Sequence, residues 1–315
     1  MSALEVSHLT KSYGDRTVVD DVSFHVASGE VFGMIGPNGA GKSTCMSMIV
    51  GLLKADSGSI SFDGTEYDLS NPELRTQLGL VPQELAIYPE LTACQNLQFF
   101  GELYGMRGQY LRQRIDDVLH LTGLTANAHH SPKTFSGGMQ RRLNFGIALL
   151  HEPKFVVLDE PTVGIDPQSR SNLLDCVRDL GQRGVGVIYV THYMEEIEAV
   201  CQRVMIIDHG RKLREGTLDE LIDRSQIDLC ITVGPIPAEL VSKLGHYGKV
   251  EDASHGARRV CIRENLQDAN GEHRGRIRTV LELLENAKVP LLGMTSQETS
   301  LETLFLSLTG RKLRD

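Results

Sequence analysis

A glycine-rich turn follows a short apolar segment near the N-terminus, and this succession constrains the fold more than any other feature of the sequence. The apolar segment reads "EVFGMI" (30–35), the turn reads "GPNGAGKS" (36–43), and the residues after it have helical spacing. Glycines let successive backbone N–H groups converge on an anion, and the N-terminal end of a helix adds positive charge. The strand–turn–helix context therefore favours a phosphate-binding loop over an ordinary glycine-rich turn.

Each residue type in this turn matches a chemical task in nucleotide binding. The turn fits the pattern GxxxxGK[ST], in which the lysine reaches the β- and γ-phosphates and the hydroxyl binds Mg²⁺. We therefore predict these two roles for Lys42 and Ser43. The other predicted nucleotide-binding residues of the loop are Gly36, Pro37, Asn38, Gly39, Ala40, Gly41 and Thr44.

Two adjacent carboxylates end a second apolar segment, "KFVVLDEP" (154–161). In open α/β sheets, ligands bind beyond the carboxyl ends of the strands. Asp159 is predicted to orient Mg²⁺ through water, and Glu160 to polarise the water that attacks the γ-phosphate. Helix capping or simple solvation is the alternative for such a pair, and the upstream phosphate-binding loop favours the catalytic interpretation.

Composition narrows the possible classes of protein. The net charge is −9 and the isoelectric point about 5.7, which argues against a general nucleic-acid binder. The six cysteines contain no CxxC pair, so we expect reduced, structural thiols in a cytosolic protein and neither a disulfide nor a zinc framework. The N-terminus lacks a signal pattern, and no apolar run approaches the roughly 20 residues that cross a bilayer. The chain is expected not to span a membrane itself.

The order of periodic segments predicts two domains. Residues 1–220 begin with alternating, antiparallel strands and continue with helical patterns over about 88–150 and a β–α–β unit over 154–192. Residues 221–315 follow the order β-α-β-β-α-β of a small ferredoxin-like α+β domain. A last helix carries the apolar stripe Leu301, Leu304, Phe305 and Leu308, which is expected to pack on the core or on a second chain.

Two further motifs lie between the loop and the carboxylates, namely "LVPQ" (80–83) and "FSGGMQRR" (135–142). Together they make residues 4–218 resemble the ATP-binding cassette family, with Met139 as a departure from its SGGQ-like signature. The resemblance implies an α/β fold with a P-loop NTPase core, an antiparallel β subdomain and a helical signature subdomain. It also implies ATP and Mg²⁺ as ligands and a head-to-tail homodimer.

In such a dimer, the signature of one chain clamps the ATP that is held by the P-loop of the other. The residues that would make this contact are Ser136, Gly137, Gly138 and Gln140. A plain helix N-cap is the alternative interpretation of the Ser-Gly-Gly sequence. Asp166 in "GIDP" resembles the loop that crosses the dimer interface, although Val163 and Ile165 depart from the usual sequence there. Helix capping is again the alternative for Asp166.

The resemblance assigns three more residues to the nucleotide site. Gln83 would contact Mg²⁺ and the attacking water, and His192 after "VIYVT" would contact the γ-phosphate. Tyr13 in "KSYG" would stack on adenine. Each has an alternative interpretation: Gln83 as an amide in a surface loop, His192 as a structural histidine, and Tyr13 as a tyrosine packed at the end of a strand. Counted together, the predicted catalytic residues are Lys42, Gln83, Glu160 and His192, and the predicted metal-binding residues are Ser43, Gln83 and Asp159.

Two segments refine the resemblance to a group of exporters. The sequences "YPELTACQNLQFFGELYGM" (88–106) and "SLETLFLSLTGR" (300–311) are similar to cassettes that work with a separate membrane permease. This implies a peripheral subunit on the cytoplasmic side of the membrane that binds no nucleic acid. The alternative is a soluble ATPase of the same family that acts on DNA or ribosomes. The 315 residues contain no second cassette, long coiled-coil insertion or zinc-binding cysteines, which are typical of that alternative.

Overall fold

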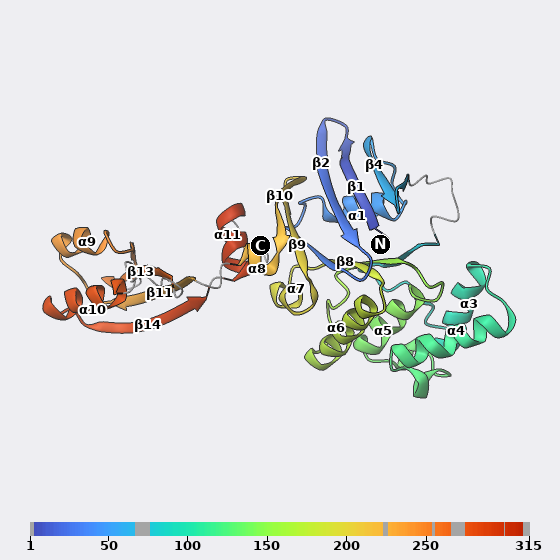
Figure 1. Ribbon diagram of the computed structural model, residues 1–315. Coiled ribbons are helices and arrows are strands. Elements are labelled where there is room, and N and C mark those ends of the chain that lie inside the picture. The colour runs from blue at the N-terminus through green and yellow to red at the C-terminus, as the bar shows by residue number, and fades with distance from the viewer. Residues whose placement is uncertain are drawn as a thin grey trace. The chain divides into compact units, whose positions relative to one another are not determined.

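The computed structural model describes residues 3–66, 76–222, 226–253, 256–265, 275–298 and 300–310. The chain divides into two compact units (Figure 1). The first comprises Met1–Leu218 together with Leu308–Asp315, and the second comprises Asp219–Ser307.

A six-stranded sheet, mostly parallel, forms the centre of the first unit. Its strand order is β10-β9-β3-β8-β7-β6, with β10 antiparallel at one edge. Strands β3 and β8 are buried at every residue, as expected for apolar segments that are covered on both faces. The strands are β3 (Val31–Ile35), β6 (Leu78–Val81), β7 (Phe155–Asp159), β8 (Gly186–Val190), β9 (Arg203–Asp208) and β10 (Arg211–Thr217).

A four-stranded antiparallel sheet forms the second layer of this unit, in the order β2-β1-β4-β5. Its alternating sequence buries one face and exposes the other. The strands are β1 (Ala3–Tyr13), β2 (Arg16–Ala27), β4 (Ser57–Phe62) and β5 (Thr65–Glu66). Helix α1 (Lys42–Ile49) lies between the two sheets, and its side chains join one hydrophobic core with both (Figure 1).

The helices follow the predicted succession. The segment expected to be a helical subdomain, about 88–150, contains α3, α4, the 3₁₀ turns η1 and η2, and α5. Helix α3 begins with a capping box between Thr92 and Gln95. The bounds are α3 (Ala93–Leu103), α4 (Gly108–Leu121), η1 (Thr125–Asn127), η2 (Pro132–Thr134), α5 (Gly137–Ile147), α6 (Pro167–Gln182), α7 (Met194–Val200) and α8 (Leu218–Leu221).

The second unit has the predicted β-α-β-β-α-β order, and its sheet order β12-β13-β11-β14 is entirely antiparallel. This is the ferredoxin-like arrangement. Leu229, Ile231 and Val233 of the central strand pack with side chains of both helices in a separate core. The elements are β11 (Gln226–Val233), α9 (Ala238–Leu244), β12 (Lys249–Asp252), β13 (Arg258–Asn265), α10 (Arg276–Asn286) and β14 (Leu291–Glu298).

One sequence-based expectation about the cysteines is wrong. Cys230 and Cys261 form a disulfide, whereas Cys45, Cys94, Cys176 and Cys201 are free thiols. The pair is 31 residues apart in sequence, but the antiparallel pairing of β11 and β13 places the two residues directly opposite each other, with Cα atoms 4.1 Å apart. Spacing along the chain could not reveal this pair, because the register of two distant strands creates it.

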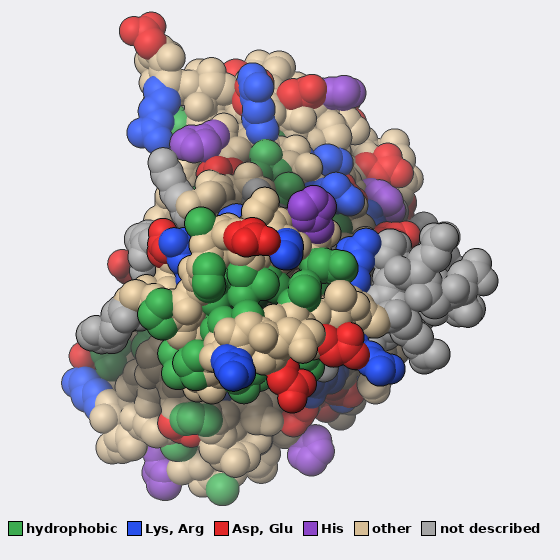
Figure 2. Space-filling view, turned by 90° about the vertical axis from the view of Figure 1, so that its left-hand side faces the viewer, with side chains coloured by type: hydrophobic (Ala, Val, Ile, Leu, Met, Phe, Trp, Pro, Cys, Tyr) green, Lys and Arg blue, Asp and Glu red, His purple; other side chains and the backbone are tan. Residues whose placement is uncertain are grey.

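The C-terminal stripe is only partly available to a second chain. In helix α11 (Leu301–Thr309), Leu301 and Phe305 are fully buried within this chain, whereas Leu308 is exposed. Hydrophobic side chains also gather on the face that Figure 2 shows. On β14, an edge strand of that unit, Leu291 and Leu292 are exposed.

Across the residues that the structure describes, no helix has both the length and the apolar character needed to cross a membrane.

Candidate nucleotide-binding and catalytic site

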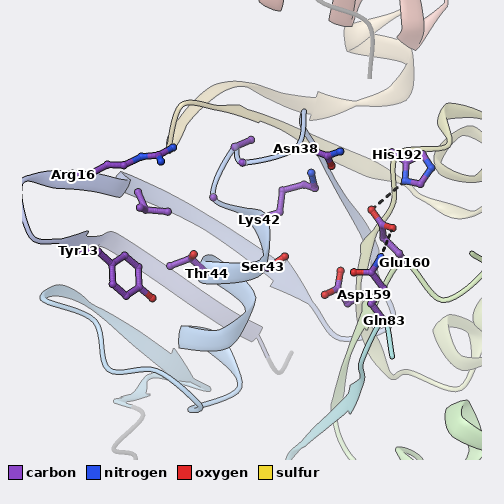
Figure 3. A pocket seen from close by; sticks show the side chains of 14 residues that line it. Tyr13, Arg16, Asn38, Lys42, Ser43, Thr44, Gln83, Asp159, Glu160 and His192 are labelled. Carbon is purple, nitrogen blue, oxygen red and sulfur yellow. Dashed lines mark hydrogen bonds and ion pairs between the residues drawn. The ribbon is translucent and has the colours of Figure 1, made fainter. Parts of the chain in front are cut away.

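A cavity of about 640 Å³ opens beside the glycine-rich loop (Figure 3). Its size lies within the range of small-ligand pockets, roughly 300–1,000 Å³. Figure 3 shows the β1–β2 hairpin on one side, the loop in the middle and the carboxylates on the other side. The lining residues are Tyr13, Arg16, Val18, Asn38, Gly39, Ala40, Gly41, Lys42, Ser43, Thr44, Gln83, Asp159, Glu160 and His192.

The loop joins β3 to α1, and its backbone needs glycine at two positions for different reasons. Gly41 has a φ of 100°, and a Cβ atom there would lie 2.6 Å from the carbonyl oxygen of Val18. A Cβ atom at Gly36 would lie 2.2 Å from the carbonyl oxygen of Ile207. Close packing on β2 and β9 therefore fixes the loop, and its residues from Asn38 to Thr44, which include the start of α1, line the cavity.

Lys42 is buried beneath this loop. Its Nζ donates hydrogen bonds to the carbonyl oxygens of Gly36 at 2.7 Å and Pro37 at 3.0 Å. Burial lowers the pKa of Lys42, and the negative charges of Glu160 and Asp159 oppose that shift. The amine is thus held within a turn of backbone dipoles, close to two carboxylates.

Glu160 is held by two of the residues that the sequence assigned to the same site. Gln83 Nε2 donates to Glu160 Oε2 at 3.1 Å, and His192 Nδ1 lies 3.1 Å from Glu160 Oε1 (Figure 3). The backbone of Glu160 has a φ of 45°, which is uncommon for a residue other than glycine, and its N–H donates to the carbonyl of Val190 at 2.8 Å. Side chains from two separate segments therefore hold the two oxygens of this carboxylate, and the second of these segments also holds the backbone of Glu160.

Asp159 lies at the end of β7, beside Glu160. Burial and the neighbouring charge of Glu160 raise its pKa from 3.8 to about 6, although Lys42 acts in the opposite direction. The ionised carboxylate is therefore unfavourable in the protein alone. A cation that binds there would remove part of this cost.

The residues predicted to hold Mg²⁺ suit that ion. Ser43, Gln83 and Asp159 line the same cavity and offer hydroxyl, amide and carboxylate oxygens, the ligand atoms that Mg²⁺ prefers. Among the described residues there is no cluster of three or more His, Cys, Asp or Glu side chains that could enclose a metal. Proteins usually supply only some of the ligands of Mg²⁺, and water and the phosphates of the substrate supply the others. The small number of protein oxygens at this site is therefore compatible with Mg²⁺ bound together with a nucleotide.

The raised pKa of Asp159 predicts an unusual effect on stability. The folded state holds this proton between pH 3.8 and about 6, so the group lowers the free energy of unfolding as pH rises through that window. We expect Asp159→Asn to raise the thermal midpoint of the nucleotide-free chain at pH 7.5 by a few degrees. The gain should shrink toward pH 5, and the exposed control Asp15→Asn should show neither effect. A lower midpoint for Asp159→Asn at pH 7.5 would contradict this prediction.

Two cavity residues were not predicted. Arg16 and Val18 follow Tyr13 across the β1–β2 turn, and Tyr13 pairs directly with Arg16 in the hairpin register. Tyr13 is 54% exposed and lines the cavity. The sequence could have predicted both residues from the β1–β2 hairpin, because residues on the two sides of a tight turn lie next to each other at the same end of the sheet.

The signature residues do not line this cavity. Ser136 instead caps α5, where its Oγ accepts a hydrogen bond from the Met139 N–H at 3.3 Å. Gly138 packs closely on α6, since a Cβ atom there would lie 2.1 Å from the Oγ of Ser169. Gly137 lies beside the carbonyl of Gly164, where a Cβ atom would be 3.6 Å away. Within one chain, the start of α5 is thus fitted against the loop that precedes α6.

Asp166 and Gln140 also make contacts within their own chain. Asp166 caps α6 by accepting hydrogen bonds from the N–H and Oγ of Ser169 at 2.9 and 2.7 Å, and Gln140 Nε2 donates to the carbonyl of Pro132 at 2.8 Å. Arg141, which was not predicted, donates to the carbonyls of Gln83 and Val163. This arginine ties the signature helix to the loop that carries Gln83.

Comparisons with known proteins agree with this geometry. A family model described as "ABC transporter" matches residues 19–163. The chain is similar to the linearmycin resistance ATP-binding protein LnrL of Bacillus subtilis (strain 168), with 42% identity over 99% of this chain and 100% of that protein. It is also similar to the Nod factor export ATP-binding protein I of Sinorhizobium fredii (strain NBRC 101917 / NGR234), with 37% identity over 99% of this chain and 88% of that protein.

A solved structure supports the fold of the first unit. A dimeric ATP-binding cassette in a post-hydrolysis state, bound to ADP and Pi, superposes with a TM-score of 0.62 and 26% identity. The match covers 68% of this chain and 98% of that one. The chain therefore belongs to the ABC transporter family, in which it is an ATP-binding and ATP-hydrolysing subunit.

Proposed function

We propose that two copies of this chain close head to tail over two MgATP and thereby drive export through a separate membrane protein. Closure would change the access state of the membrane subunits, and hydrolysis with product release would reset them. The observation that carries the proposal is that one cavity gathers the glycine-rich loop, Gln83, both carboxylates and His192. These elements are far apart in sequence, and they face one nucleotide-sized space.

We assign the binding roles as follows. The N–H groups of the loop from Gly36 to Thr44 and the amine of Lys42 bind the β- and γ-phosphates, and Tyr13 stacks on adenine. Ser43, Gln83 and Asp159 hold Mg²⁺, which when bound neutralises the charge of the phosphates. The hydrogen bonds of Lys42 to the loop carbonyls support this role, because they keep the amine beside the cavity.

Hydrolysis is assigned to the cluster around Glu160. Its carboxylate accepts a proton from the water that attacks the γ-phosphate. The position of this carboxylate supports the role, since it lines the cavity on the side opposite the hairpin. Gln83 and His192 each engage one of its two oxygens, so they orient it and are placed to contact the water and the γ-phosphate. The signature residues Ser136, Gly137, Gly138 and Gln140, together with Asp166, act on the nucleotide of the second copy.

Two domains divide the work in this proposal. Residues 1–220 form the ATPase domain with its helical subdomain at about 88–150, and residues 221–315 form an accessory domain. The division of the chain near Leu218 supports this boundary. We propose that the accessory domain contacts the second copy, and the exposed apolar edge of β14 is the part of its surface that supports this.

The membrane partner and the direction of transport rest on the relatives. Their names state linearmycin resistance and Nod factor export, and both functions fit a subunit on the cytoplasmic face of the membrane. The helical subdomain offers a surface for such a partner, because Tyr88, Phe99, Leu103 and Tyr104 are exposed on or beside α3. We propose that a cytoplasmic helix of the permease docks there.

A co-purification experiment tests the partner. The chain is co-expressed with a multi-span membrane protein encoded beside it, and the complex is isolated in detergent. We expect the partner to change the ATPase rate, and we expect Leu103→Glu to reduce co-purification strongly, because Leu103 is 67% exposed on α3. The ATPase rate of the isolated Leu103→Glu chain should stay near wild type. The matched control is Gln98→Glu, which adds the same negative charge at an exposed position of the same helix that is already polar, and it should co-purify like wild type.

Two outcomes would count against the proposal. If Leu103→Glu co-purified as well as Gln98→Glu and wild type, the docking surface would be wrong. If double-stranded DNA or ribosomes stimulated the ATPase while the membrane protein did not, the chain would be a soluble ATPase of this family instead.

A further inference from the structure

Glu196 is a buried carboxylate outside the cavity that the assigned roles do not use. It lies in the first turn of α7 and is 1% exposed. Its Oε1 accepts a hydrogen bond from Thr162 Oγ1 at 2.7 Å, and its Oε2 accepts from the hydroxyls of Tyr189 at 2.9 Å and Thr191 at 3.0 Å. All three donor residues are fully buried as well. Buried ionisable groups are rare unless they are paired, so this cluster calls for an explanation.

The donors come from the two segments that carry the catalytic pair. Thr162 is two residues after Glu160, and Thr191 directly precedes His192. The Oγ of Thr191 also accepts the N–H of Tyr193 at 3.0 Å, so the backbone is fixed on both sides of His192. One carboxylate thus joins the turn after β7 to the turn after β8.

A cation completes the cluster and reaches the same histidine. Arg170 Nε lies 3.4 Å from Glu196 Oε1, and the guanidinium stacks over the Tyr193 ring at 4.7 Å. That ring in turn lies 4.2 Å from the His192 ring, measured between centroids. Arg170 therefore neutralises the buried charge and supports the ring that packs on His192.

We propose that Glu196 is a positioning residue for hydrolysis, which sets Glu160 and His192 at the separation that the reaction needs. The inference rests on the proposed roles of that pair. The His192–Glu160 hydrogen bond joins two loops, and each loop is anchored to a different oxygen of the same carboxylate. A small displacement of either loop would break that alignment, and errors of about 1 Å in catalytic geometry cost up to about 100-fold in rate.

A carboxylate is required at this position for a chemical reason. Its two oxygens accept three hydroxyl hydrogen bonds and face one guanidinium. A glutamine would present one acceptor and one N–H₂ donor, so at least one hydroxyl would have to turn away, and Arg170 would lose its anion. Glu196→Gln therefore loosens one of the two loops without changing the shape of the side chain.

The experiment compares Glu196→Gln with Glu195→Gln in the purified full-length chain. Both variants remove one negative charge from the first turn of α7, but Glu195 is exposed. We expect Glu196→Gln to lower kcat by about 10-fold or more, with the Kd for ATP within about twofold of wild type. Glu195→Gln should match wild type in both. Wild-type kcat in Glu196→Gln would overturn the inference.

A second variant tests the inference even if Glu196→Gln destabilises the folded chain. Thr162→Val removes one donor on the Glu160 side and keeps the charge of Glu196 paired with Arg170. It should also lower kcat with ATP affinity unchanged, and its thermal midpoint should show that the chain is folded. If Glu196→Gln unfolds, Thr162→Val decides: unchanged kcat would overturn the inference.

A double-mutant cycle separates positioning from general packing. If Glu196 acts through His192, then adding Glu196→Gln to His192→Ala should cost little further activity, whereas independent effects would multiply. Multiplying effects would assign Glu196 a packing role only. The proposed function is tested separately by Glu160→Gln. If that variant is inactive while the Glu196 and Thr162 variants are normal, only this inference fails.

Discussion

Replacing Glu160 by glutamine should lower the rate of ATP hydrolysis by at least about 100-fold while leaving ATP binding nearly unchanged. The carboxamide has the shape of the carboxylate but cannot accept the proton of the attacking water. The contacts from Gln83 and His192 reach this side chain and not the nucleotide-binding loop, so the loop should keep its affinity. With binding intact and hydrolysis blocked, the closed dimer should accumulate.

Size-exclusion chromatography with and without MgATP measures that accumulation, and a phosphate-release assay measures turnover. The control is Glu84→Gln, an exposed acid beside Gln83 that does not line the cavity. It should hydrolyse ATP at the wild-type rate and form no stable dimer. Turnover of Glu160→Gln near the wild-type rate would remove Glu160 from the catalytic role.

Ser136→Arg should abolish the ATPase activity of the chain without abolishing ATP binding, because the signature residues lie outside the chain's own cavity. Mixing this variant with Lys42→Ala gives the sharper test. A heterodimer then contains one site that combines the intact loop of the first variant with the intact signature of the second. We expect the mixture to recover activity that neither variant shows alone.

A control is needed for the loss of the helix cap that Ser136 provides. Arginine at this position loses the hydrogen bond that Ser136 accepts from the Met139 N–H, and losing such a cap costs about 0.5–2 kcal/mol. Ser136→Ala shares that loss without the bulk of arginine, so it should be equally destabilised and still dimerise. If Ser136→Arg hydrolysed ATP as a monomer at the full rate, or if the mixture stayed inactive, the signature would not act across a dimer.

Local patterns determined a large part of this protein. The glycine-rich turn between an apolar segment and a helix predicted the phosphate-binding loop, and the carboxylates at the end of β7 predicted the opposite wall of the same cavity. The β-α-β-β-α-β order of the second unit also followed from the sequence. These features are readable because periodicity, turn chemistry and strand ends depend on residues that are neighbours in the chain.

Tertiary structure alone decided the contacts between distant segments. The disulfide of Cys230 and Cys261 depends on the register of β11 with β13, and the buried cluster of Glu196 depends on packing α7 against the turns after β7 and β8. The stripe of α11 likewise proved half buried in its own chain. A sequence specifies such contacts only through the complete fold, since strand register and burial of a polar group are set by all the surrounding elements at once.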